Sequence, residues 1–145
     1  MTRNIVAKID LILHATEDFQ KIAEPLNDLF AIEKEDIAKQ ELSGHFGNPI
    51  LMLHMDLKKK RADQFIKKLV SLIPKDMIAD LLENIEKQIF KSSLYMRFSK
   101  QDFVKQILTL EEKDPIRVAI YVPTYVKKET PETYRKLLSE NSGNA

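Results

Sequence analysis

The sequence ILMLHMDL at residues 50–57 is followed directly by KKKRADQFIKKLVSLI at residues 58–73, and the hydrophobic spacing changes where the two segments join. In the first segment apolar side chains occupy every second position on one face, which is typical of a half-buried strand. In the second segment apolar residues recur at intervals of three and four, which predicts a helix that packs on a core. The whole stretch therefore indicates a sheet covered by a helix.

The residues before this stretch predict a second strand, a helix and a hairpin. Residues 5–15 alternate between apolar and polar side chains, as a strand with one wet face does. Asp18 can cap a helix over residues 19–30, in which Pro25 lacks a backbone N–H and predicts a kink or two short helices. Residues 32–42 are charged, with a weak strand pattern near their end. A glycine-containing turn then predicts a hairpin with the strand at 50–57.

The residues after this stretch predict one more helix and several short elements. Pro74 ends the first helix, and the apolar spacing beyond it predicts a second helix that extends to Ile89. The other expected elements are a strand at 94–98, a helical turn at 100–105, a short strand at 107–110, a turn at 111–115, a strand at 116–122 and a helix at 131–138. The Ser-Gly-Asn tail is expected to be disordered.

The order of these elements predicts the fold class. Hairpins dominate and no long βαβ series is present, so we expect an α+β fold with a largely antiparallel sheet and helices packed on one face. The other face of the sheet is then open to solvent or to a partner. We expect residues 1–124 to form a single α+β domain and residues 125–145 to form a short C-terminal helix and a disordered tail.

The composition limits the function. Of 145 residues, 43% are hydrophobic and 31% are charged, which is a globular composition. The absence of cysteine excludes disulfides, thiolate metal sites and a cysteine nucleophile. The net charge is only +1, from 23 basic and 22 acidic residues, so any nucleic-acid site has to be a local patch. Residues 1–10 lack the apolar core of a signal peptide, and no apolar run could span a membrane, so we expect a cytoplasmic protein.

The histidines do not form a recognisable catalytic pattern. His14, His45 and His54 lack the spacing of an HExxH motif, and no phosphate-binding or nucleophile motif is present. We interpret the histidines as surface or hydrogen-bonded residues, with a metal-dependent enzyme as the alternative. We therefore expect no enzyme activity, no cofactor and no metal.

The wet face of the expected sheet combines aromatic rings with cations. Its members are Lys8, His14, His54, Tyr95, Arg97, Arg117 and Tyr121. Rings stack on unpaired bases while arginine and lysine bind phosphates, so this face is suited to RNA. The alternative is that Tyr95 and Tyr121 are cross-strand partners that only stabilise the sheet.

A basic run and a glycine loop are further candidates for phosphate binding. Lys58, Lys59, Lys60 and Arg61 open a helix, where cations oppose the helix dipole, so helix stability alone does not explain them. The alternative is a solvated charge run. The loop before Ile50 contains Gly44, His45, Gly47 and Asn48, and its backbone N–H groups could approach a phosphate.

Four short segments occur together in the order of a known family. They are HATED at 14–18, GHFGNPI at 44–50, LYMRFSKQ at 94–101 and DPI at 114–116. Together they resemble the archaeal RNA-binding family described as a predicted exosome subunit, over about residues 5–122. One departure is Ser99, where the family is expected to carry aspartate.

The resemblance implies a fold similar to that of the ribosomal protein that binds 5S rRNA, with RNA as the ligand and without catalytic residues. By position it suggests His45, Asn48, Arg97, Lys100 and Gln101 as RNA-binding residues. We therefore expect a non-catalytic RNA-binding accessory protein, with RNA-processing proteins as further partners. The alternative is a protein-interaction module that acts through its open sheet face or an edge strand, or as a homodimer.

Overall fold

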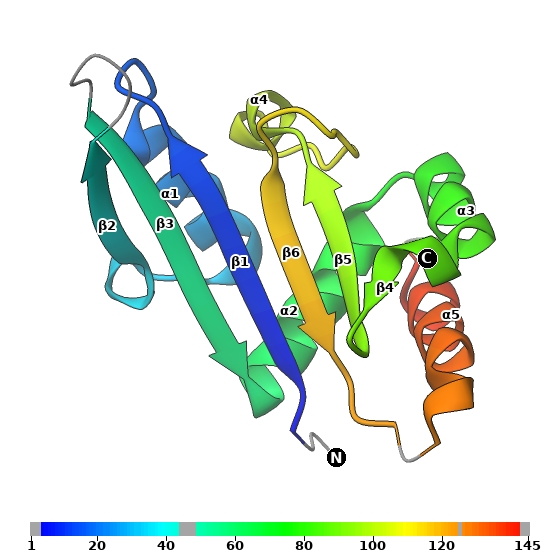
Figure 1. Cartoon of the computed structure of the whole chain (residues 1–145). Helices are drawn as coiled ribbons and strands as arrows, with labels where there is room; N and C mark the ends of the chain where they lie inside the picture. Colours follow the sequence, from blue (N-terminus) through cyan, green and yellow to red (C-terminus); the bar gives the residue numbers. More distant parts are fainter. Residues whose placement is uncertain (1–3, 44–48, 125, 143–145) are drawn as a thin grey trace.

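The computed structural model describes residues 4–43, 49–124 and 126–142. Its six-stranded sheet has the order β2-β3-β1-β6-β5-β4, and each neighbouring pair is antiparallel (Figure 1). The strands are β1 (Val6–Leu13), β2 (Ala38–Ser43), β3 (Pro49–Lys58), β4 (Ile89–Phe90), β5 (Ser93–Phe98) and β6 (Ile116–Tyr121). The expected α+β fold with a largely antiparallel sheet is confirmed.

Strand β1 lies inside the sheet and determines which side chains share a face. It pairs with β3 along its whole length and with β6 from Val6 to Asp10. Alternate residues of β1, such as Ile9 and Leu11, are buried, whereas Lys8 between Ala7 and Ile9 is exposed. Directly paired residues point to the same face, so the register extends this division across the sheet.

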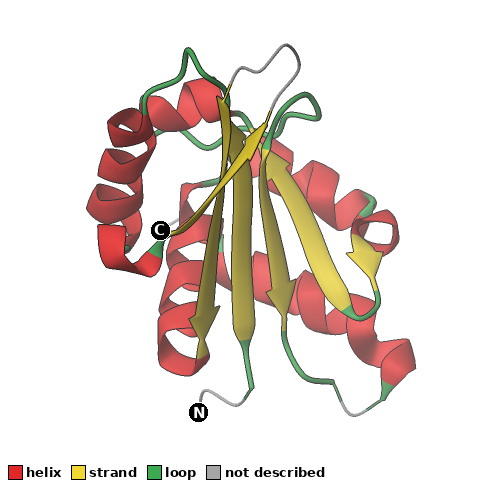
Figure 2. Cartoon of the chain, turned by 60° about the vertical axis from the view of Figure 1, so that its left-hand side comes forward, coloured by secondary structure: helices red, strands yellow, loops and turns green. Residues whose placement is uncertain are grey.

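The helices cover one side of the sheet. They are α1 (Phe19–Phe30), α2 (Lys59–Leu72), α3 (Lys75–Glu83), α4 (Lys100–Val104) and α5 (Thr130–Asn141). Helix α2 crosses behind the central strands in Figure 1, and Figure 2 shows the strands in front of the helices. Among the described residues, no helix has the length and apolar composition needed to cross a membrane.

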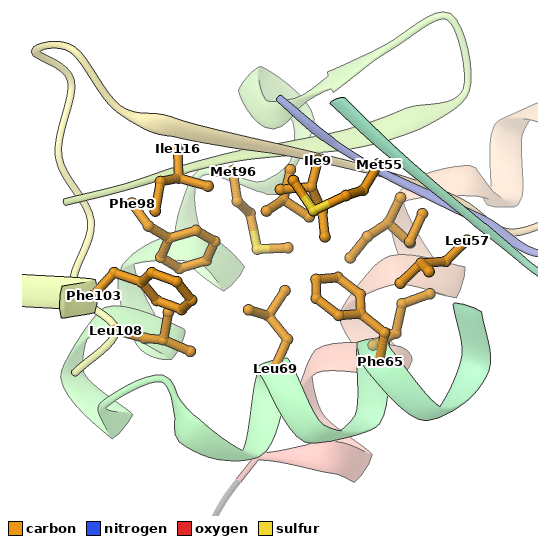
Figure 3. Packing of buried hydrophobic residues seen from close by; sticks show 14 of the residues in the cluster. Ile9, Met55, Leu57, Phe65, Leu69, Met96, Phe98, Phe103, Leu108 and Ile116 are labelled. Carbon is orange, nitrogen blue, oxygen red and sulfur yellow. The ribbon is translucent and has the colours of Figure 1, made fainter. Parts of the chain in front are cut away.

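The core lies between α2 and the inner face of the sheet. Phe65 and Leu69 of α2 point toward Ile9, Met55 and Phe98 of the strands (Figure 3). Burial of each such side chain stabilises the fold by roughly 1.5–3 kcal/mol relative to exposure. The helical spacing of 58–73 and the strand spacing of 50–57 therefore bury their apolar residues in the same core.

Helix α1 is continuous through Pro25, so the predicted alternative of two short helices is wrong. Pro25 has no N–H and removes one hydrogen bond to the carbonyl four residues earlier. At the start of the helix the Asp18 carboxylate accepts a hydrogen bond from the Gln20 N–H. Ile22 and Leu26 are buried beside Pro25. The cap and this burial offset the lost hydrogen bond.

Helix α3 ends at Glu83, so the predicted extension to Ile89 is wrong. A 3₁₀ segment, η3 (Ile85–Gln88), follows, and then Ile89 and Phe90 pair with β5 as strand β4. Apolar residues at 85 and 89 fit a continuing helix as well as this arrangement. The pairing with β5 decides between them, and it is a contact that local spacing does not reveal.

The predicted strand at 107–110 is also wrong. Of these residues only Leu110 forms a bridge, with Phe98. Gln106 has a φ of 64°, which turns the chain, and Leu108 is buried in the core. Leu108 therefore anchors a loop in the core, and the segment does not add a strand to the sheet.

Helix α5 packs against the rest of the described chain through buried Tyr134 and Leu138. It ends at Asn141, three residues beyond the expected end. The Tyr134 hydroxyl shares its proton between the carbonyl oxygens of Ser92, at 2.7 Å, and Ile120, at 3.1 Å, and accepts a hydrogen bond from the Val122 N–H. This one side chain joins α5 to the end of β6 and to the β4–β5 turn.

Candidate nucleic-acid interface

The side of the sheet without helices forms a polar surface that we call the open face. On the four inner strands its outward positions are Val6, Lys8, Asp10, Ile12, Ile50, Met52, His54, Asp56, Lys58, Ser93, Tyr95, Arg97, Arg117, Ala119 and Tyr121. None of these residues is buried. Of the predicted wet-face residues, the register brings Lys8, His54, Tyr95, Arg97, Arg117 and Tyr121 together here, whereas His14 follows the end of β1.

Arg97 and Arg117 lie directly opposite each other on β5 and β6, and both are exposed. Like charges in this position destabilise a strand pair by roughly 0.2–1 kcal/mol. Glu112 lies 3.7 Å from Arg97 but is 82% exposed, so it compensates little. Asp10 is opposite Arg117, but it is hydrogen-bonded to His54. The two guanidinium groups can therefore bind an anionic ligand together.

The aromatic residues of the open face are not cross-strand partners. Tyr95 is opposite Ala119, and Tyr121 is opposite Ser93, so the two rings are diagonal neighbours. The alternative in which they only stabilise each other as a direct pair is therefore wrong.

A third ring, Phe90 on β4, is not among the predicted site residues, because it lies between the helix expected to end at Ile89 and the strand expected to begin at Leu94. It is 62% exposed, and its ring centroid lies 6.4 Å from that of Tyr95. Its exposure depends on the β4–β5 pairing, which local hydrophobic spacing did not signal.

His54 lies between two carboxylates on the open face. Its Nδ1 lies 2.5 Å from Asp10 Oδ1, and its Nε2 lies 3.0 Å from Asp56 Oδ2. The hydrogen bond with Asp10 raises the pKa of His54, and the bond with Asp56 and both negative charges act in the same direction against burial. A protonated His54 offsets the charge of Asp10 and Asp56 next to the arginines.

The raised pKa of His54 predicts how stability depends on pH. Protonated His54 stabilises the folded state fully below its ordinary pKa of 6.5, and this stabilisation is lost as the pH rises through the higher folded value. We expect the free energy of unfolding in urea to fall as the pH rises above about 6.5. The variant His54→Gln should show a flatter profile. An equal decrease in the variant would assign the effect to another group.

A second polar cluster lies where β1 ends, around the ammonium group of Lys100. Lys100 is only 6% exposed, and its Nζ donates to the Ile12 carbonyl at 2.6 Å, to Glu17 Oε1 at 2.9 Å and to Asp114 Oδ2 at 2.8 Å. Burial raises the pKa of Asp114, but hydrogen bonds and charge from Lys100 and His14 outweigh it and lower the pKa overall. Lys100 is thus engaged inside the protein and does not reach the open face.

The same cluster has the composition of a metal site. His14, Glu17 and Asp114 each offer a ligand atom, and these atoms lie within 4.8 Å of one another. The Lys100 ammonium, however, is already bonded to both carboxylates, so the protein's own cation compensates their charge. The resulting arrangement is a structural ion-pair network.

The predicted basic run is divided between two sides of the sheet. Lys58 is an outward residue of β3, whereas Lys59, Lys60 and Arg61 form the first turn of α2. Arg61 donates to both carboxylate oxygens of Asp36, at 3.0 and 2.9 Å, and this pairing lowers the pKa of Asp36. Only Lys58 of the four joins the open face by register.

The remaining candidates lie elsewhere. Gln101, on α4, lines a groove of about 410 Å³ together with Thr16, Lys21 and Lys105. The loop candidates Gly44, His45, Gly47 and Asn48 lie outside the described residues. The described candidates that share one surface are therefore those of the open face.

Comparison with solved structures identifies relatives of the whole fold. The DUF54 protein AF2318 of Archaeoglobus fulgidus superposes with a TM-score of 0.78 at 28% identity, covering 93% of this chain and 99% of that chain. The DUF54 protein SSO0741 of Sulfolobus solfataricus has a TM-score of 0.74 at 28% identity, covering 93% and 98%. The arrangement of helices on an antiparallel sheet is thus shared with solved archaeal proteins.

Sequence comparisons extend this relationship. The protein MJ0213 of Methanocaldococcus jannaschii is 27% identical over 143 residues, covering 94% of this chain and 96% of the relative. The RNA-binding protein PAB1135 of Pyrococcus abyssi is 34% identical over 130 residues, covering 84% of each. A family model described as RNA binding matches residues 7–122. The chain belongs to this RNA-binding family, as the four sequence segments indicated.

Proposed function

We propose that this chain is a non-catalytic RNA-binding protein and that RNA binds on the open face around Arg97 and Arg117. The observation that carries the proposal is the direct pairing of these two arginines on an exposed surface. Such a pair costs stability when nothing binds between the two charges, and a phosphate would remove that cost. The RNA-binding description of the family, and the name of its Pyrococcus abyssi member, support the choice of ligand.

The charge distribution supports a local site. The net charge of +1 gives no general attraction to RNA, so binding has to depend on where cations gather. Lys8 and Lys58 lie on the same face as the arginine pair. The acids on that face, Asp10 and Asp56, are both hydrogen-bonded to His54. The part of the open face around Arg97 and Arg117 can therefore attract a phosphate backbone.

A binding role also accounts better than catalysis for His14 and His54, the two histidines that the structure describes. Both ring nitrogens of His54 are hydrogen-bonded to carboxylates, and His14 is bonded to Asp114. The resemblance to a predicted exosome subunit suggests that binding serves RNA processing. Co-purification with exosome subunits tests that partner, and its absence would restrict the proposal to RNA alone.

A salt titration tests the proposed function. If Lys8, Lys58, Arg97 and Arg117 contact phosphates, log K should fall with log salt at a slope between about −2.8 and about −3.6, since each contact contributes about −0.7 on single strands and about −0.9 on duplexes. Fluorescence anisotropy with a labelled oligoribonucleotide gives this slope. No binding at low salt, or a slope near zero, would refute the proposal. Light scattering of the free protein tests the alternative, because a dimer through the open face would cover the arginines.

A further inference from the structure

We infer that the RNA held on the open face is unpaired, and that Phe90, Tyr95 and Tyr121 form a platform on which its bases stack. This inference rests on the proposed function and specifies the ligand for it. We call these three residues the aromatic platform. It lies at the β4 side of the sheet, beside the arginine pair on β5 and β6.

Phe90 is the most exposed member of the platform. It is 62% exposed, although a phenyl ring contributes to folding mainly when it is buried. The Lys91 ammonium lies 5.4 Å from the ring centroid, so a cation that could meet a phosphate accompanies the ring. Proteins that bind single-stranded nucleic acid commonly combine an exposed ring, on which a base stacks, with a nearby cation that contacts a phosphate.

The backbone holds Phe90 in place. Phe90 pairs with Ser93, and the two residues between them, Lys91 and Ser92, have φ values of 49° and 69°. Two positive φ values in a two-residue hairpin loop are typical of a tight turn, and they are unfavourable for residues other than glycine. The hydrogen bond from the Tyr134 hydroxyl to the Ser92 carbonyl helps to hold this turn.

The same hydroxyl also holds the third ring. It donates to the carbonyl oxygen of Ile120 and accepts from the N–H of Val122, the two residues on either side of Tyr121. Tyr134 is fully buried and does not reach the open face. It is therefore a positioning residue that keeps both ends of the aromatic platform in register.

The geometry favours unpaired bases over a duplex. The rings of Phe90 and Tyr95 are tilted by 59°, with centroids 6.4 Å apart, so they do not close into a parallel stack with each other. Tyr121 is 37% exposed. In a duplex the flat faces of the bases are covered by their neighbours, whereas unpaired bases can turn out and stack on protein rings.

The spacing along β5 provides for both parts of a nucleotide. Tyr95 and Arg97 are successive outward residues, about 7 Å apart along the strand. Arg97 lies opposite Arg117, so a row of cations follows directly after the rings. When the bases of a bound strand stack on the rings, its phosphates can therefore lie next to the arginine side chains.

The test compares oligouridine with a duplex of oligouridine and oligoadenine of the same length, by anisotropy. Wild-type protein should bind the single strand more tightly. Phe90→Ala should weaken that binding by about 5- to 150-fold and leave binding to the duplex unchanged. Ile107→Ala is the matched control, because Ile107 is 49% exposed and lies outside the platform. Phe90 is also mostly exposed, so its substitution should leave thermal unfolding unchanged.

Phe90→Trp gives a direct readout. The chain has no other tryptophan, so its fluorescence reports on this position alone. We expect the Phe90→Trp variant to bind oligouridine tightly. Its tryptophan fluorescence should be quenched on binding, because a base stacks on the indole ring. If Phe90→Ala binds oligouridine like wild type and the tryptophan is not quenched, the stacking inference is wrong. Binding of both RNAs with a steep salt dependence would then still support the proposed function, whereas binding of neither would refute both.

Discussion

Changing Arg97 and Arg117 together to glutamate is expected to reduce RNA affinity by more than about a hundredfold at low salt. Each arginine can make a charge-assisted hydrogen bond to a phosphate, worth roughly 1.5–3 kcal/mol, and the reversed charges repel the backbone. The slope of log K against log salt should become shallower by about 1.4 for a single strand, because two contacts are lost. Anisotropy over a range of salt concentrations measures both quantities.

The control has to change net charge equally elsewhere. Lys68→Glu with Lys136→Glu does so on α2 and α5, the helices that lie away from the open face. This variant should bind RNA about as tightly as wild type. An equal loss in both double variants would mean that binding follows net charge and that the open face has no special role.

A neutral variant separates function from stability. Arg97→Gln with Arg117→Gln removes the repulsion between two directly opposed cations, so the free energy of unfolding should rise by a few tenths of a kcal/mol, at the low end of about 0.2–1 kcal/mol because both groups are exposed. RNA affinity should fall in the same variant. A fall in both the free energy of unfolding and the RNA affinity would indicate that the two arginines stabilise the sheet.

Changing Lys100 to methionine is expected to destabilise the protein by about 2–3 kcal/mol. The ammonium is 6% exposed and has three acceptors, on Ile12, Glu17 and Asp114. Its removal leaves two carboxylates close to each other without the cation between them. For a chain of this length the unfolding temperature should fall by roughly 6–12 °C, measurable by circular dichroism.

The exposed Lys105, which directly follows the last residue of α4, provides a matched control for this change. Lys105→Met removes the same charge and should shift the free energy of unfolding by no more than about 0.5 kcal/mol. At a temperature where it is folded, Lys100→Met should bind RNA like wild type, because its ammonium does not reach the open face. Loss of RNA binding by the folded variant would identify Lys100 as a contact after all.

The lowered pKa of Asp114 gives this prediction a pH dependence. Ionised Asp114 stabilises the fold fully above its ordinary pKa of 3.8, and the stabilisation is lost as the pH falls through the lower folded value. The difference in stability between wild type and Lys100→Met should therefore shrink in acid below about pH 4. A difference that stays constant in acid would mean that the Lys100–Asp114 pair contributes little.

Hydrophobic spacing alone predicted the long elements of this protein, because it is a local property of the chain. The alternation at 50–57 and the helical spacing at 58–73 correspond to β3 and α2, and the open face with Tyr95, Arg97, Arg117 and Tyr121 follows from the same alternation. The predictions for residues 84–89 and 107–110 were wrong, because a few apolar residues in a short segment fit a helix, a strand or a loop equally well.

What the tertiary structure decided was the partner of each polar or aromatic group. Lys100 looks like a surface cation in the sequence, yet it is bonded to the carbonyl of Ile12, 88 residues away. Phe90 becomes an exposed ring beside Tyr95 only because β4 pairs with β5. Burial and strand pairing depend on segments far apart in the chain, so residue spacing predicts which face a side chain occupies but not what it meets there.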